Sequence, residues 1–369
     1  MYNNLFVNSK VISGKDCLVN SSNMLHQFGK KCLIVTGKSG AKKSGALDDA
    51  FTALSMQDIE FGIYDNIGEN PLVSSVIEGG KCAREMGADF IMGIGGGSAL
   101  DASKAVAICA ANPEFDIDGL YNRQNPAKAL PVVLVGTTAG TGSEVTGVSV
   151  LTNDKNMQKK SIGGADCYAA LVFADAKYTY SMPYNTTVST ALDAFAHAVE
   201  GFFSPKCTEY PEVYARLSIP MIYKCLKALL NEKALPSKEV RDELFLGSLY
   251  AGLELNVCGA AFPHTVGYIL TEEFSVPHGK ACAALMPRLL MKAKCYSTER
   301  FHEFLRLCGE NEVKVIETIK ELADVKISAT DEQLNKWCSR WGDVKNFHNT
   351  PGDFTNEEAV EALKELIAN

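Results

Sequence analysis

The sequence lacks several features that would place it in other classes of protein. Its 12 cysteines include no CxxC pair, its start shows no charged segment followed by an apolar run, and no apolar stretch reaches membrane-spanning length without a charge or a glycine. Cysteines scattered in this way indicate free thiols in a reducing compartment, most of them small core residues outside any metal site. We therefore expect a cytoplasmic protein without a signal peptide or a transmembrane helix.

Basic residues are fewer than acidic ones. Lys and Arg number 36 against 44 Asp and Glu, which gives a net charge of −8 at pH 7. An acidic surface without a basic stripe disfavours nucleic acid and anionic membranes as partners. What is present, 46% hydrophobic residues in a chain of 369, is enough apolar material for two packed domains.

Apolar strands alternate with amphipathic helices in the first half of the chain. We predict strands at Lys31–Gly37, Glu60–Asp65, Phe90–Gly95 and Leu130–Gly136, and helices at Ala46–Leu54, Val73–Met86 and Ala99–Ala111. Such alternation is typical of α/β proteins in which a parallel sheet carries helices on both faces.

Beyond Pro183 the pattern becomes helical. We predict helices at Val188–Phe203, Glu212–Asn231, Ser237–Val257, Pro287–Cys295, Glu299–Cys308 and Val313–Leu322. Strand-like runs nearly vanish, and there is no internal repeat at a fixed period. The sequence therefore predicts an α/β domain over residues 1–183 and an all-helical domain over residues 184–369.

Two glycine-rich segments each follow a predicted strand. In Gly93–Lys104 (GIGGGSALDASK) the candidate phosphate-binding residues are Gly95, Gly96, Gly97 and Ser98, with Asp101 placed to hold the loop. In Gly136–Thr146 (GTTAGTGSEVT) the candidate hydroxyl donors are Thr137, Thr138, Thr141 and Ser143. Neither segment has the GxGxxG spacing of ordinary Rossmann domains, but two such loops at strand ends suit a dinucleotide that spans the edge of the sheet.

A third loop bears on the choice of dinucleotide. Gly37–Gly45 (GKSGAKKSG) follows the first predicted strand, and Cys32 stands where a P-loop would need glycine, which excludes a Walker A motif. Enzymes that prefer NAD usually carry an acidic residue near this point, whereas this chain has Gly37, Lys38 and Ser39. We therefore expect NADP(H) in preference to NAD(H).

Three of the six histidines and one aspartate form a candidate metal site. Asp193 and His197 lie four residues apart on a helix whose other residues are mostly apolar or small, so both side chains can reach one ion. His264 and His278 follow in the segment FPHTVGYILTEEFSVPHGK. One carboxylate and three imidazoles suit a divalent first-row metal, Fe(II) or Zn(II).

With these motifs the chain resembles the iron-containing (group III) alcohol dehydrogenases over nearly its full length. GIGGGSALDASKA, TTAGTGSEVT, the helix with Asp193 and His197, and the segment from His264 to PHG stand in the order and spacing of that family. Within the family, VTGKSGAKKSGALDDA and NTPGDFT resemble short NADP-linked alcohol or 1,3-propanediol dehydrogenases. The resemblance implies a fold like that of dehydroquinate synthase, with a dinucleotide-binding α/β domain and a metal-binding helical domain.

The resemblance also implies roles for individual residues. Asp193, His197, His264 and His278 match the metal ligands, and Gly96, Gly97 and Ser98 match the pyrophosphate loop. Further cofactor-side positions are Asn70, Thr137, Thr138, Thr141, Lys159 and Met182. Members that prefer NAD carry an aspartate at the position of Gly37. Some members have a second histidine four residues after the third ligand, proposed as a proton carrier, and Tyr268 stands there in this chain.

These expectations define an enzyme that passes a hydride between NADP(H) and a small primary alcohol, diol or aldehyde, with His264, His278 and Tyr268 as candidate catalytic residues. An NAD-linked glycerol or 4-hydroxybutyrate dehydrogenase, a lyase resembling dehydroquinate synthase and a non-catalytic nucleotide-binding protein remain as alternatives. A homodimer or higher homo-oligomer is expected because such enzymes are commonly symmetric oligomers.

Overall fold

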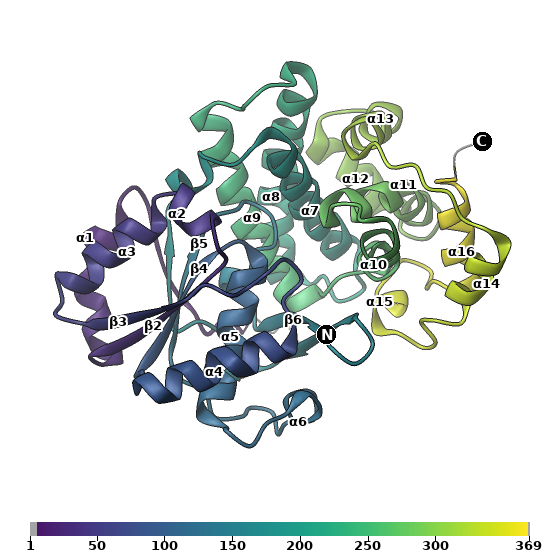
Figure 1. The fold of residues 1–369 in the computed structure, drawn as a ribbon. Coiled ribbons are helices and arrows are strands. Elements are labelled where there is room, and N and C mark those ends of the chain that lie inside the picture. Colours follow the sequence, from purple (N-terminus) through teal and green to yellow (C-terminus); the bar gives the residue numbers. More distant parts are fainter. Residues whose placement is uncertain (1–5, 368–369) are drawn as a thin grey trace. The chain divides into compact units, whose positions relative to one another are not determined.

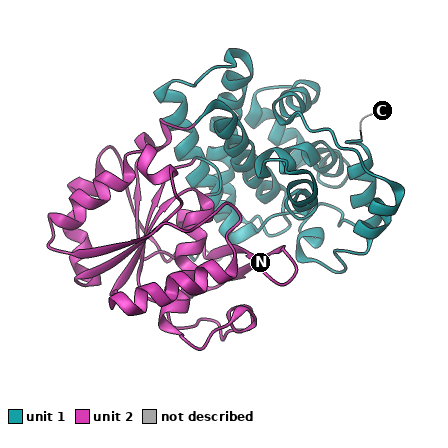
Figure 2. Cartoon of the chain, in the orientation of Figure 1, with its two compact units in different colours: residues 1–6, 139–141, 183–369 teal, residues 7–138, 142–182 magenta. Residues whose placement is uncertain are grey.

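The computed structural model of the protein describes residues 6–367, which divide into two compact units (Figure 2). The α/β unit comprises Val7–Thr138 and Gly142–Met182. The helical unit runs from Pro183 to the end of the described chain and also includes Phe6 and Ala139–Thr141. The main change from one unit to the other therefore falls between Met182 and Pro183.

Six parallel strands form the sheet of the α/β unit, in the order β1-β8-β5-β4-β2-β3 (Figure 1). The strands are β1 (Lys10–Ser13), β2 (Lys31–Thr36), β3 (Glu60–Tyr64), β4 (Phe90–Gly95), β5 (Val132–Gly136) and β8 (Leu171–Ala174). Because every neighbouring pair is parallel, the carboxyl ends of β2, β4 and β5 meet at one edge of the sheet. The four strands predicted from the sequence are confirmed.

Two strands of this sheet and an antiparallel pair outside it were not expected from the sequence. β8 is the buried run LVFA, and β1 is a sheet-edge strand with little burial. Such short runs show no periodicity that separates them from loops. The antiparallel pair consists of β6 (Val148–Asn153) and β7 (Gln158–Gly163).

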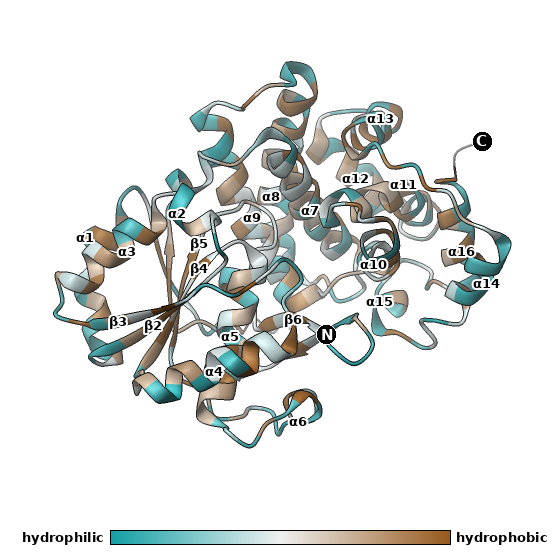
Figure 3. Ribbon diagram, in the orientation of Figure 1, coloured by the Kyte–Doolittle hydropathy of each residue, from teal (hydrophilic) through white to brown (hydrophobic). Residues whose placement is uncertain are grey.

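Helices cover both faces of the sheet, as predicted. α4 (Val73–Met86) and α5 (Gly97–Ala111) cover one face, and α1 (Cys17–Asn20) and α3 (Ala46–Ser55) cover the other (Figure 1). A strand buried on both faces needs apolar side chains at every position, which explains the continuous apolar runs (brown in Figure 3). The shorter helical segments of this unit are α2 (Gly40–Lys43), α6 (Ile117–Tyr121), η1 (Ser22–Phe28), η2 (Ser143–Val145), η3 (Ala165–Cys167) and η4 (Ala176–Thr179).

The helical unit is built around α7 (Tyr184–Phe203), which is buried along most of its length and packs against α8, α9 and α11. The other helices are α8 (Glu209–Glu232), α9 (Lys238–Cys258), α10 (Phe262–Phe274), α11 (His278–Tyr296), α12 (Thr298–Cys308), α13 (Glu312–Ala323), α14 (Asp331–Cys338), α15 (Lys345–His348) and α16 (Asn356–Lys364). A helix surrounded by others has no polar face, which accounts for the largely apolar sequence of α7.

The expected start of one helix at Pro287 is wrong. α11 begins at His278 and contains Pro287 in its interior. Proline favours the first turn of a helix, which makes Pro287 resemble a helix start, but Pro287 lies in the interior of α11. α10 was not expected as a helix at all.

Among residues 6–367 no single helix has the length and apolar character of a membrane span. The pair α9 and α10, which is bent by 111°, meets that description only when the two helices are taken together.

Candidate active site

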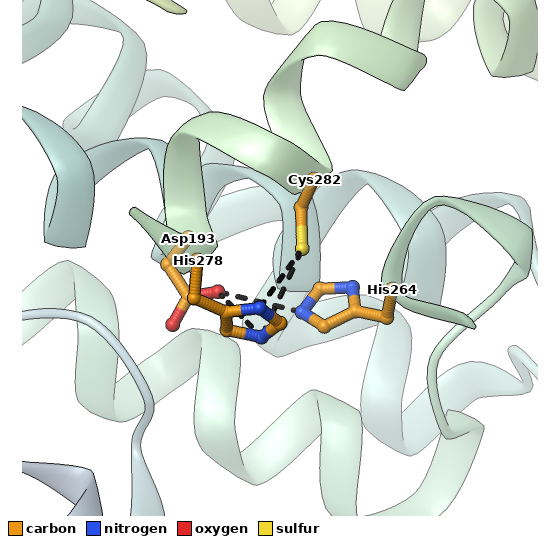
Figure 4. Close-up of side chains that lie close together, drawn as sticks. All are labelled: Asp193, His264, His278 and Cys282. Atoms are coloured by element: carbon orange, nitrogen blue, oxygen red, sulfur yellow. Dashed lines mark hydrogen bonds and ion pairs between the residues drawn. The ribbon is translucent and has the colours of Figure 1, made fainter. Parts of the chain in front are cut away.

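Four polar side chains from three helices converge in the interior of the helical unit. Asp193 and His197 project from one face of α7, and α10 and α11 bring His264 and His278 beside them. His264 Nε2 lies 3.4 Å and His278 Nε2 lies 3.8 Å from Asp193 Oδ1 (Figure 4). His197 stacks on His264 with ring centroids 4.4 Å apart. Three of the four residues predicted as metal ligands, Asp193, His264 and His278, thus bring ligand atoms within 4.8 Å of one another, and His197 lies beside them against His264.

The first turn of α11 approaches α7 closely because residue 279 is glycine. A Cβ at Gly279 would lie 1.8 Å from the carbonyl oxygen of Ser189 on α7, so a larger residue would push the two helices apart. His278, the preceding residue, is brought to Asp193 by this contact.

Several atoms in the cluster are buried without a hydrogen-bond partner. Asp193 Oδ1, His197 Nδ1 and His264 Nε2 have none, although the three residues are only 4–6% exposed. An unsatisfied buried polar atom costs about 1–3 kcal/mol, and a cation held by these three atoms would remove that cost. The donor set of one carboxylate and imidazoles fits a divalent metal such as Fe(II) or Zn(II).

The carboxylate of Asp193 is held in its charged form. Burial raises the pKa of this group, but the neighbouring histidines, His197 first among them, outweigh burial and hold the pKa below its ordinary value. An ionised carboxylate in this position is ready to bind a cation.

The candidate cofactor residues gather at the carboxyl edge of the sheet in the α/β unit. Gly37 follows β2, Gly96 follows β4 and Thr137 follows β5, and these three strands are neighbours. The N–H of Thr137 donates to the carbonyl of Gly95 at 2.8 Å. A Cβ at Gly96 would lie 2.9 Å from Thr138 Cγ2, so the glycine lets the two loops touch. This edge is where open α/β sheets bind dinucleotides.

Asp101 fastens the glycine-rich turn to the segment after β5. Its carboxylate accepts hydrogen bonds from Ser143 Oγ at 2.5 Å and from the N–H of Val150 at 2.8 Å. The buried Lys104 Nζ donates to the same Ser143 Oγ at 2.8 Å. Asp101 and Ser143 therefore hold the loops in place through contacts within the protein.

The other cofactor positions predicted from the sequence lie at several places in the chain. Asn70 and Lys159 lie near each other, because Thr152 pairs with Lys159 across β6 and β7 and donates its N–H to the carbonyl of Pro71. Thr141 belongs to the segment that groups with the helical unit, and Met182 is the last residue of the α/β unit. Lys38 and Ser39 are exposed and follow Gly37, the first residue after β2.

Two family profiles together cover most of the chain. The profile of the iron-containing alcohol dehydrogenases matches residues 8–176, and that of the C-terminal part of the Fe-containing alcohol dehydrogenase family matches residues 187–366. The chain belongs to the iron-containing alcohol dehydrogenase family. It is therefore an oxidoreductase of this family, and its helical unit carries the family's C-terminal part.

Individual relatives match along most or all of the chain. The 1,3-propanediol dehydrogenase of Klebsiella pneumoniae is 32% identical over 287 residues, which are 77% of this chain and 73% of the relative. The crystal structure of an iron-containing alcohol dehydrogenase from Thermotoga maritima has a TM-score of 0.91 and 34% identity and covers 98% of this chain and 99% of its own. Sulfoacetaldehyde reductase from Bifidobacterium kashiwanohense, solved in complex with NAD+, has a TM-score of 0.87 and 26% identity over 99% of both chains.

Glu200 contacts the candidate metal site, and it was not predicted from the sequence. Its carboxylate lies 2.6 Å from His264 Nδ1 and accepts the N–H of Ala261 at 2.6 Å, and the side chain is fully buried. Carboxylates that bind the far nitrogen of a metal-binding histidine fix its ring orientation. The signal was present in the sequence, since Glu200 follows Asp193 by two helical turns on a helix that is otherwise apolar.

Cys282 also lies in the cluster, contrary to the expectation that no cysteine belongs to the metal site. Its Sγ is 3.8 Å from His278 Nε2, and one ligand atom each from Asp193, His264, His278 and Cys282 fall within 4.8 Å of one another (Figure 4). Cys282 follows His278 by four residues, so the spacing that identified Asp193 and His197 applies here too.

Tyr268, the sequence-derived candidate for proton transfer, lies beside the same histidine. It is on α10, one turn after His264, and its ring stacks on that of His278 with centroids 5.5 Å apart. Its hydroxyl is therefore carried on the helix that also carries His264.

Proposed function

We propose that this enzyme transfers a hydride between NADP(H) and a small primary alcohol, diol or aldehyde, with Fe(II) or Zn(II) bound by Asp193, His197, His264 and His278. The observation that carries the proposal is the convergence of buried ligand atoms without partners at Asp193, His197 and His264. When bound, a divalent metal supplies a Lewis acid for the substrate oxygen. The names of the 1,3-propanediol dehydrogenase and sulfoacetaldehyde reductase relatives support short substrates with a terminal oxygen function.

Different parts of the chain have different roles in the proposed reaction. Residues 1–183 act as the dinucleotide domain and residues 184–369 as the metal and substrate domain. Glu200 orients His264 by accepting a hydrogen bond at Nδ1, which leaves Nε2 for the metal. Gly96, Gly97 and Ser98 present backbone amides to the pyrophosphate at the start of α5. Hydride transfer then requires the nicotinamide carbon to reach the substrate carbon.

The reaction class is tested on protein stripped of metal and reloaded anaerobically with Fe(II) or Zn(II). Loss of reduced-cofactor absorbance with short aldehydes should depend on the metal and should disappear in His264→Ala. A His264→Ala variant with full activity would overturn the metal assignment. The absence of turnover with NADPH and with NADH across aldehydes and ketones would overturn the proposed reaction.

The preference for NADP(H) rests on the loop after β2. Gly37 carries no acidic side chain to repel a 2′-phosphate, and Lys38, Lys42 and Lys43 nearby are exposed. In the Gly37→Asp variant, kcat/KM should fall for NADPH and hold or rise for NADH. A Cβ at Gly37 would lie 3.1 Å from the carbonyl oxygen of Ile67, so Gly37→Ala is the control that separates crowding from charge. A wild-type enzyme that is faster with NADH would overturn the preference.

We propose Tyr268 as the proton carrier. Replacing it with phenylalanine keeps the ring that stacks on His278 and removes only the hydroxyl. We expect kcat to fall by about 100-fold or more, the usual contribution of a positioned acid or base, with metal content unchanged. An unaltered kcat and pH profile would assign the proton transfer elsewhere.

We propose a cytoplasmic location on the basis of the cysteines. All 12 cysteines are free, which suits a reducing cytoplasm. A homodimer or higher homo-oligomer is proposed because soluble enzymes commonly form symmetric assemblies, and light scattering of the purified protein tests it.

A further inference from the structure

A second cluster of ligand-type side chains lies in the helical unit, apart from the Asp193 group. Cys207, from the loop between α7 and α8, meets Glu254 and Cys258 of α9. One sulfur or oxygen atom from each of the three residues lies within 4.8 Å of the others. Glu254 and Cys258 are four residues apart on one helix face, the spacing that lets two side chains reach one ion.

Glu254 is the residue that needs an explanation. Its side chain is fully buried, and neither carboxyl oxygen has a hydrogen-bond partner. The neighbouring helix α7 makes room for it, since a Cβ at Gly201 would lie 2.7 Å from Glu254 Oε1. Burial raises the pKa of Glu254 well above its ordinary value. A carboxyl in such a place is either protonated and unsatisfied or paired with a cation.

A cation, Arg300, lies beside one of the two cysteines. Arg300 Nη2 lies 3.4 Å from Cys207 Sγ, and the guanidinium sits 4.2 Å from the ring centroid of Phe202. The hydrogen bond between the two thiols lowers the pKa of Cys207, as does the charge of Arg300, and the same bond together with burial raises the pKa of Cys258. Arg300 also binds Glu212 at 2.9 Å, which keeps the guanidinium in position. Metal binding would displace the protons of Cys258 and Glu254, and a divalent cation together with Arg300 would then balance the three negative charges.

We propose that Cys207, Glu254 and Cys258 form a second metal site, for a thiophilic divalent cation such as Zn(II). Two sulfurs and one carboxylate oxygen are a zinc-type donor set, and water can complete the tetrahedron because Cys207 is only partly buried. The ion joins the loop after α7 to the end of α9. It has a structural role and does not depend on the proposed reaction.

Metal content of the reduced protein, stripped and reloaded anaerobically with Co(II), tests the site. Wild type should bind a second equivalent of Co(II), which Cys258→Ser and Glu254→Gln should lose while keeping the first. Cys225→Ser is the matched control, because Cys225 is a buried thiol of the same unit outside the cluster. In a Cys282→Ser background the thiolate-to-Co(II) charge-transfer absorption should persist and should vanish when Cys258→Ser is added. A single equivalent in wild type would overturn the proposal.

Alkylation followed by peptide mass analysis gives a readout that is independent of the catalytic metal. Zn(II) should protect Cys207 from iodoacetamide, whereas the exposed Cys295 in the same chain should react at an unchanged rate. The protection should survive in His264→Ala, so that failure of the proposed reaction and failure of this site are distinguishable. Equal alkylation of Cys207 with and without Zn(II) would overturn the site. So would a Cys207–Cys258 disulfide in the freshly isolated protein that leaves no thiol for metal.

Discussion

Glu200 holds the ring of His264 at Nδ1, the nitrogen on the other side of the ring from Asp193. It accepts from two donors at once, at His264 Nδ1 and at the N–H of Ala261. A glutamine in its place has only one oxygen, so one of the two donors would face an amide N–H. We expect Glu200→Gln to weaken metal binding by about 10–100-fold, the range found for partners of metal-binding histidines.

The measurement for Glu200 is a metal titration against a competing chelator. Glu273→Gln is the control, since Glu273 is an exposed carboxylate on the same helix as His264. Equal affinity in both variants and wild type would mean that Glu200 fills space and does not position the ring.

Glu144, in the loop after β5, makes stability depend on pH. Burial raises its pKa from 4.5 to about 7. A carboxyl whose pKa is raised by folding favours the folded state while it is protonated, and this contribution is lost as the pH rises from 4.5 through 7. Glu144→Gln removes this titration. The unfolding free energy of the variant should therefore rise relative to that of wild type by about 1.4 kcal/mol per pH unit across that window. The total difference should reach roughly 3 kcal/mol at pH 8.

Chemical denaturation of both proteins at pH 4.5 and at pH 8 measures this difference. At the lower pH the two side chains are close to equally neutral, so that measurement is the internal control. A difference in unfolding free energy that does not change with pH would contradict the assigned environment of Glu144.

At the scale of elements, the sequence predicts the strands and helices that have a clear hydrophobic pattern. It does not predict those that depend on contacts with distant parts of the chain. β2, β4 and β5 are buried on both faces, so their apolar runs are long enough to recognise. β8 has only four residues, and α11 continues through Pro287, so neither follows from local pattern. The same limit applies to the site. The spacing of Asp193 and His197 is local, but the contact of Glu200 with His264 joins residues far apart in the chain.

The junction of α7 and α11 depends on Gly279. Its Cβ position is 1.8 Å from the carbonyl oxygen of Ser189, which is backbone and cannot move aside alone. We expect Gly279→Ala to destabilise the protein by about 1–3 kcal/mol, as overpacking does, and to weaken metal binding because His278 shifts with the helix. Gly40→Ala is the control, since no atom lies within 4 Å of its Cβ position. Unfolding in denaturant and metal titration together test this, and an unaffected Gly279→Ala variant would contradict the packing described for α11.

At the scale of the whole molecule, metal binding should appear as stability. The proposed ligand atoms of Asp193, His197 and His264 are buried without hydrogen bonds, so we expect the metal-free protein to retain their cost and the loaded protein to lose it. A ligand that binds only the folded state at 100 times its Kd adds about 2.7 kcal/mol to the unfolding free energy.

The experiment uses Cys258→Ser protein, so that any ion at the second proposed site is removed from the comparison. In that background we expect Zn(II) to raise Tm, and adding Asp193→Asn should abolish most of the rise, because the amide keeps the shape of the side chain and loses its charge. The two metal-free proteins serve as the baseline for each rise. An equal rise in both would mean that Zn(II) stabilises the fold elsewhere, and the four side chains on α7, α10 and α11 would then be a packed polar cluster instead of a metal centre.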